Sequence, residues 1–60
     1  GRKMDKVKTY TDGKNSWHLS GAKAKWKVVV TRNEDNEQLQ VVPFKRKKVA
    51  VAWILQQGAS

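Results

Sequence analysis

The side chains in this sequence that could do chemistry are mainly cations, and they occur in two groups. The first group alternates with apolar residues in the segment 22–28, and the second is a continuous block that follows Pro43 and Phe44. Lysine and arginine bind phosphate groups through charge-assisted hydrogen bonds. The sequence therefore predicts a phosphate-binding surface made of Lys23, Lys25, Lys27, Lys45, Arg46, Lys47 and Lys48.

The overall charge also favours a polyanionic partner. Thirteen lysines and arginines stand against five acids, which gives a formal net charge of +8. Because a compact domain with this excess repels itself, we expect a nucleic-acid partner. Lysine offers a point charge and not a bidentate fork, so the expected contacts are with the phosphates of double-stranded DNA and are mainly independent of its sequence. A lysine-rich surface without such a partner is the alternative, and an anionic membrane surface is less favoured because no segment resembles a basic amphipathic helix.

The same residues give little support for catalysis. His18 is the only histidine, there is no cysteine, and most carboxylates lie in segments that are typical of turns. No nucleophile, base and orienting group can be assembled from them, and neither a thiolate metal site nor a glycine-rich phosphate loop is present. We expect a non-catalytic domain with no cofactor and no metal, inside the cell and associated with nucleic acid.

Five large aromatic residues could either stack on bases or fill the core of so small a domain. Trp26 and Trp53 lie on the apolar phases of their segments, which predicts core positions for both. Tyr10, Trp17 and Phe44 are open to either role and are possible aromatic contacts. Exposed rings would favour RNA or single-stranded DNA, whereas a cage of these three rings would favour a chromo-type or Tudor-type domain that binds methylated lysine.

The elements that position the two basic groups are predicted to be β-strands. The alternation is clearest from Ala22 to Arg32, where apolar residues would form one face and the first group of lysines the other. A polar turn over 33–37 and a second strand over 38–44 complete a hairpin. Pro43 cannot donate to a sheet, so it is expected at the end or edge of its strand.

Shorter elements precede this hairpin. A strand over 5–10 would suit a sheet edge, and Asp12-Gly13 predicts a chain reversal. A strand of about four residues then follows over 16–19. Residues 1–3 and 58–60 carry no pattern and are expected to be disordered.

The apolar segment near the C-terminus has two interpretations. Larger and smaller residues alternate from Val49 to Leu55, which favours a fifth strand. A helix from Val49 to Gln57 is the alternative, because alanine, leucine and glutamine are good helix formers and Gly58 could follow its end. With the strand, the chain is a single all-β domain over 1–60, a five-stranded SH3-like barrel.

Several short motifs follow one another over residues 10–43. Tyr10-Thr11-Asp12, then Trp17, then Trp26, a hairpin tip over 33–36 and Leu39-Gln40-Val41-Val42-Pro43 precede the basic block. In this order and spacing the central stretch resembles the C-terminal domain of retroviral, especially lentiviral, integrases. The resemblance covers about forty residues.

This resemblance implies both a fold and a partner. It implies a five-stranded SH3-like barrel in which Lys45 and Arg46, with Lys48 close by, contact viral DNA. Such a domain would hold DNA for catalytic carboxylates in another domain, in the virion and the host nucleus, and would form a homodimer through an exposed sheet face. Three departures limit the match: Phe44 replaces the first basic residue of the run, the segment 18–20 replaces a Lys-Gly-Pro motif, and the glycines that usually follow the second tryptophan are absent.

Overall fold

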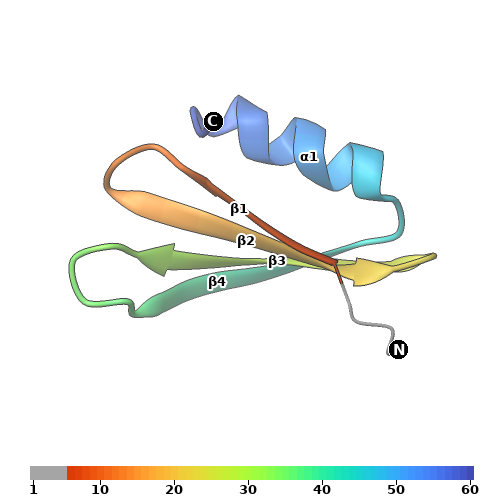
Figure 1. Cartoon of the computed structure of the whole chain (residues 1–60), viewed down its shortest axis with the longest axis horizontal. Coiled ribbons are helices and arrows are strands. Elements are labelled where there is room, and N and C mark those ends of the chain that lie inside the picture. Colours follow the sequence, from red (N-terminus) through yellow and green to blue (C-terminus); the bar gives the residue numbers. More distant parts are fainter. Residues whose placement is uncertain (1–5) are drawn as a thin grey trace.

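The protein folds as a meandering β-sheet with one helix laid across it (Figure 1). The computed structural model describes residues 6–60, so the expectation for residues 1–3 lies outside the described range. Neighbouring strands are antiparallel, in the order β1-β2-β3-β4. The elements are β1 (Lys6–Thr11), β2 (Asn15–Ala22), β3 (Lys25–Arg32), β4 (Gln38–Phe44) and α1 (Lys47–Gln56). The chain is therefore mostly β and not all-β as predicted, because one helix accompanies the four strands.

One face of the sheet carries the core. Trp17 and Leu19 of β2 lie opposite Val30 and Val28 of β3, and all four side chains are buried. Their polar or charged neighbours in sequence face the other way, as in a strand that is buried on one side only. The predicted apolar phase of β3, which includes Trp26, is confirmed.

Helix α1 covers this face. Ala50 and Ile54 are four residues apart, so they share one side of the helix, and both are fully buried against the strands. Trp53 is half-buried against the core, as predicted, whereas Val49 and Leu55 remain half exposed. The predicted fifth strand is wrong and the alternative helix is confirmed. The physical reason is coverage: a helix of this length spans about 15 Å across the strands, whereas a fifth strand would extend the sheet and leave its apolar face open.

The sheet does not close into the predicted barrel. β1 and β4 are its two edges, and within residues 6–60 no strand joins them. The prediction of a five-stranded SH3-like barrel is therefore wrong, and the structure is an open four-stranded sheet with one covered face. Pro43 lies on the edge strand β4, as predicted, where a missing N–H group is tolerated.

The turn between β2 and β3 lies later in the chain than the sequence suggests. β2 continues to Ala22 and the chain reverses at Lys23 and Ala24, so Lys23 belongs to the turn and not to a strand. Gly21 has a φ of +137°, and a Cβ at this position would overlap the carbonyl oxygen of Lys25. Glycine therefore allows the two strand backbones to approach each other closely.

The C-terminal residues are held against β1. The backbone N–H of Ser60 donates to the carbonyl oxygen of Thr11 at 3.1 Å, and the N–H of Thr11 donates to the carbonyl oxygen of Ser60 at 3.2 Å. Ala59 is buried in the core. The expectation of disorder over 58–60 is thus corrected, because the helix returns the chain to the edge of the sheet.

Candidate nucleic-acid interface

The antiparallel sheet brings two separate connections to the same end of the molecule. β2 and β4 both run toward this end, so the β2–β3 turn and the connection from β4 to α1 both lie there (Figure 1). Trp26, near the start of β3, pairs with Phe44 at the end of β4. The two basic groups of the sequence are attached to these two connections.

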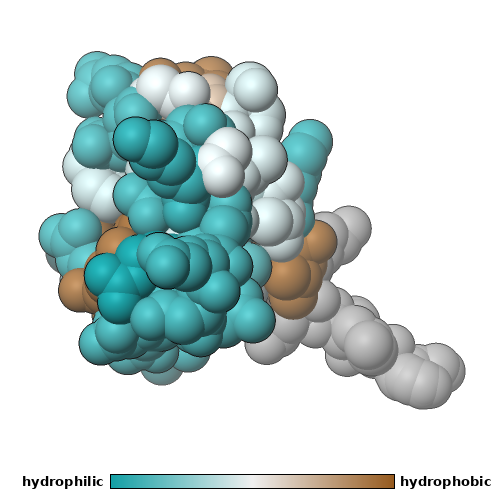
Figure 2. All heavy atoms as spheres, turned by 90° about the vertical axis from the view of Figure 1, so that its left-hand side faces the viewer, coloured by the Kyte–Doolittle hydropathy of each residue, from teal (hydrophilic) through white to brown (hydrophobic). Residues whose placement is uncertain are grey.

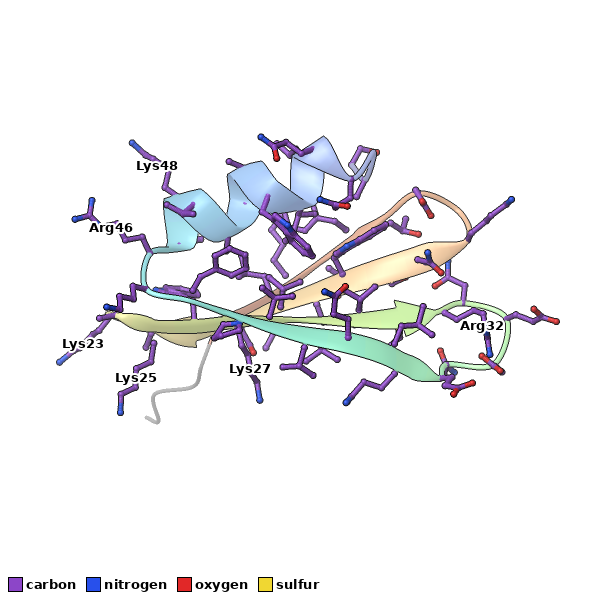
Figure 3. All side chains as sticks on the ribbon, turned by 180° about the vertical axis from the view of Figure 1, so that it is seen from behind. Lys23, Lys25, Lys27, Arg32, Arg46 and Lys48 are labelled. Atoms are coloured by element: carbon purple, nitrogen blue, oxygen red, sulfur yellow. The ribbon has the colours of Figure 1, made fainter. Side chains whose placement is uncertain are left out.

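The side chains of both groups gather at this end. In Figure 3 the labelled cations of the two groups extend from the same end of the molecule, whereas Arg32 lies at the other. A shallow hollow of about 340 Å³ lies between the groups, and Lys25 from one and Lys45 from the other help to line it. We call this surface the basic end, and it comprises Lys23, Lys25, Lys27, Lys45, Arg46, Lys47 and Lys48.

The acidic residues lie at the opposite end. Asp12 is in the β1–β2 turn, and Glu34, Asp35 and Glu37 are in the connection between β3 and β4. Figure 2 looks onto this end and shows its lower part covered by hydrophilic residues. Asp5, the remaining acid, precedes the described residues. The folded chain therefore separates its charges along the strands.

Hydrogen bonds fix the charge of the acidic turns. Arg32 Nη2 donates to Asp35 Oδ2 at 2.9 Å and to Glu37 Oε1 at 2.7 Å. The hydrogen bond from Arg32 lowers the pKa of Asp35, and the same contact raises the pKa of Arg32. In the other turn, backbone N–H groups, that of Asn15 first, donate to Asp12 and lower the pKa of its carboxyl. These carboxylates therefore stay ionised to lower pH than free ones.

The cations of the basic end have no carboxylate partner in the described chain. Both ion pairs between residues 7 and 60 belong to Arg32, at the far end. The basic end is organised by Trp26, whose indole N–H donates to the carbonyl oxygen of Lys23 at 2.7 Å. The same ring lies 5.8 Å from Lys47 Nζ. Trp26 thus contacts both basic groups, a positioning role that sequence analysis missed because the apolar phase of β3 explained this residue as core alone.

The start of α1 lacks the features that usually stabilise a helix N-terminus. Its N-cap is Arg46, which has an extended backbone and makes no side-chain hydrogen bond to the first turn. Lys47 and Lys48 follow, and the first turn contains no acid. A helix N-terminus carries a partial positive charge and favours acidic side chains or bound anions. Four consecutive cations at 45–48 are therefore unfavourable for the free helix.

The sheet face opposite the helix is uncovered. We call it the open face, and alternation assigns to it the odd-numbered residues of β1, β3 and β4 and the even-numbered residues of β2. Near its centre His18 bridges two strands, with Nδ1 3.3 Å from Thr9 Oγ1 and Nε2 2.9 Å from Thr31 Oγ1. Lys25 and Lys27 are on this face, and none of the four described strands contains an acidic residue.

The possible aromatic contacts do not form one exposed site. Trp17 is only 5% exposed, so the suggestion that it could be open to a ligand is wrong. Phe44 packs against Trp53, with ring centroids 5.7 Å apart, and Tyr10 is half-buried. Across the paired strands Tyr10 is aligned with Gln40 of β4, and Gln40 lies four residues before Phe44. At 3.3 Å per residue, Tyr10 and Phe44 are therefore separated along the strands by about 13 Å. A cage made of these three rings is therefore not present.

Two other kinds of feature are absent from the described residues, 6–60. No three histidine or acidic side chains gather there as metal ligands would, and no helix there is long and apolar enough to cross a membrane. The sequence matches no protein-family model, and neither curated proteins nor solved structures gave a match. The resemblance to integrase domains stays a prediction.

Proposed function

We propose that the basic end binds double-stranded DNA through its phosphates. The observation that carries the proposal is the separation of charge: the seven cations of the β2–β3 turn, the start of β3 and the segment 45–48 lie at one end, and four acids lie at the other. A phosphate backbone is the polyanion that such a surface fits best. The acidic end would face away from the DNA and would orient the approach of the domain.

The position of the aromatic rings favours duplex over single-stranded partners. Stacking on bases requires exposed rings, but Trp17 is buried and Phe44 packs against the helix. Six of the seven cations at the basic end are lysines, which are point charges that bind phosphate without reading a base. Sequence-independent contact with the duplex backbone is the mode that these residues support.

The expected strength of this contact can be stated as a salt dependence. Each phosphate neutralised on duplex DNA contributes about 0.9 to the log–log slope of affinity against salt. Contacts from five to seven of the cations would give a slope of roughly −4.5 to −6. The loss of one contact should therefore weaken binding about eightfold at 0.1 M salt, if it leaves the affinity at 1 M salt unchanged.

The test is a salt titration with matched variants. A labelled duplex of about twelve base pairs is roughly 41 Å long and exceeds the 33 Å length of the protein. Lys45→Ala should weaken binding about eightfold at 0.1 M salt and reduce the slope by about 0.9. Lys14→Ala, which removes the same charge from an exposed residue at the acidic end, should change neither. Equal effects from the two variants, or no duplex binding by the unchanged protein, would overturn the proposal.

The integrase resemblance adds a narrower hypothesis. In it the domain holds viral DNA for a catalytic domain, and Lys45, Arg46 and Lys48 make the contacts. A preference for a duplex with a retroviral end sequence over an unrelated duplex would support this hypothesis. Equal affinity for the two duplexes would leave only the general phosphate-binding function.

A further inference from the structure

We infer that the DNA site extends from the basic end onto the open face of the sheet, so that a stretch of sugar–phosphate backbone lies across β2 and β3. This inference rests on the proposed function and enlarges its footprint. The charge, the hydrogen-bonding groups and the area of the sheet face that the helix leaves uncovered support this inference.

Charge connects the open face to the basic end. Lys25 and Lys27 belong to both, because they lie near the start of β3 and alternate onto the uncovered side. Figure 3 shows both side chains extending away from the helix, on the far side of the sheet from Arg46 and Lys48. Residues two apart on one strand are about 6.6 Å apart, so both can contact the same strand of a nucleic acid. DNA held by these lysines must therefore lie partly on the side of the sheet opposite the helix.

Polar residues of β2 and β3 on the open face also suit a phosphate backbone. Ser20 is paired with Lys27 across β2 and β3, and Thr31 lies further along β3. Serine and threonine hydroxyls often contact phosphate and sugar oxygens. The described strands offer no carboxylate to repel such a backbone. His18 has both ring nitrogens within hydrogen-bond distance of threonine hydroxyls, so its polar atoms are satisfied within the sheet.

A second copy of the chain fits this face less well. Four strands 4.8 Å apart and six to eight residues long cover roughly 450 Å², and a stable protein–protein interface needs about 800 Å² from each partner. The exposed apolar residues are also divided between the two edges of the sheet: Val7 is on β1, and Leu39 and Val41 are on β4. Two copies pressed together would in addition bury Lys25 and Lys27 without partners.

Two adjacent residues of β4 give a matched test. Val41 is 47% exposed on the open face, and Gln40 is exposed on the side of the helix. Val41→Glu and Gln40→Glu place the same negative charge at nearly the same distance from the basic end, on opposite faces. Val41→Gln separates the effect of charge from the loss of the valine. Melting curves of all three variants verify that they fold.

The affinity for the twelve-base-pair duplex decides the outcome. At about 50 mM salt, Val41→Glu should bind roughly 3 to 10 times more weakly than Val41→Gln, as expected for one like charge near the backbone. Gln40→Glu should stay within about twofold of the unchanged protein. Equal losses on the two faces, with Lys45→Ala still weakened, would overturn the extended footprint and leave the basic end as the whole site. If sedimentation shows a dimer that Val41→Glu dissociates, the face belongs to a second copy and the inference is also overturned.

Discussion

Arg46 is the residue at which stability and DNA binding are expected to oppose each other. It is the N-cap of α1, its backbone angles are φ −132° and ψ 136°, and it makes no capping hydrogen bond. These angles are the ones in which aspartate or serine would cap the helix. Replacing Arg46 with Asp should therefore add a capping hydrogen bond, place a negative charge at the positive end of the helix dipole and remove a DNA contact.

The magnitudes follow from these three changes. A side-chain cap contributes about 1 kcal/mol, and a favourable charge at the helix N-terminus contributes about 0.3 to 1 kcal/mol. Together they should raise the melting temperature by roughly 5 to 16 °C in a chain of this size. Binding of duplex DNA should weaken by at least about eightfold at 0.1 M salt, since one contact is lost and one repulsive charge is gained.

Two further substitutions at the same position separate the effects. Arg46→Ser should differ from Arg46→Gln by the cap alone, so the difference between these two variants should persist at high salt, whereas part of the gain in Arg46→Asp should disappear because the dipole term is screened. Arg46→Gln removes the charge without a strong cap and should weaken binding with little gain in stability. The measurements are thermal melts at low and high salt, followed by fluorescence anisotropy with the duplex. If neither Ser nor Asp stabilises the protein, or if Asp stabilises it and leaves DNA affinity unchanged, the reasoning about Arg46 is refuted.

Three other predictions test the turns at the two ends of the sheet. Gly21→Ala should destabilise the protein by about 2 kcal/mol or more and lower its melting temperature by at least 8 °C, because the added Cβ would overlap the backbone of Lys25. Gly13→Ala is the control and should cost less, since a Cβ there meets no atom within 4 Å. Equal costs would contradict the close approach of the backbone at Gly21. The pKa of Asp12 is lowered by folding, so its charge stabilises the protein above about pH 4 and ceases to do so as the pH falls through the folded value. Denaturant melts of Asp12→Asn and the unchanged protein should therefore converge at acid pH, and a constant difference from pH 7 to pH 2 would exclude this account. Asn33→Ala should destabilise the protein by about 1 to 3 kcal/mol, because the side chain joins the two turns of the acidic end, and an unchanged urea midpoint would show that this contact is not needed.

Some features of the protein could be predicted because they depend on residues close together in sequence. The chain reversal at Asp12-Gly13, the alternation of β3 and the edge position of Pro43 are all confirmed. Each follows from a local property: glycine accepts positive φ, strand side chains alternate, and proline has no N–H group. The list of cations at the candidate site also came from the sequence alone.

The tertiary structure decided what local patterns could not. The segment 49–55 satisfies a period of two and a helical period at once, and the choice depended on the need to cover Trp17 and Leu19 of the sheet. Trp17 is buried for the same reason, although nothing near it in sequence requires burial. Ser60 is hydrogen-bonded to Thr11 only because α1 returns the end of the chain to β1.

The sequence by itself determined that this protein carries two basic groups and the hairpin that connects them. Only the register and the antiparallel order of the strands decided that both groups lie at one end, with Lys25 and Lys45 beside the same hollow, and that the acids lie at the other. The physical reason is that distance in space along a sheet is set by strand pairing, which joins residues far apart in the chain. Charge is a property of the composition, whereas a charged surface is a property of the fold.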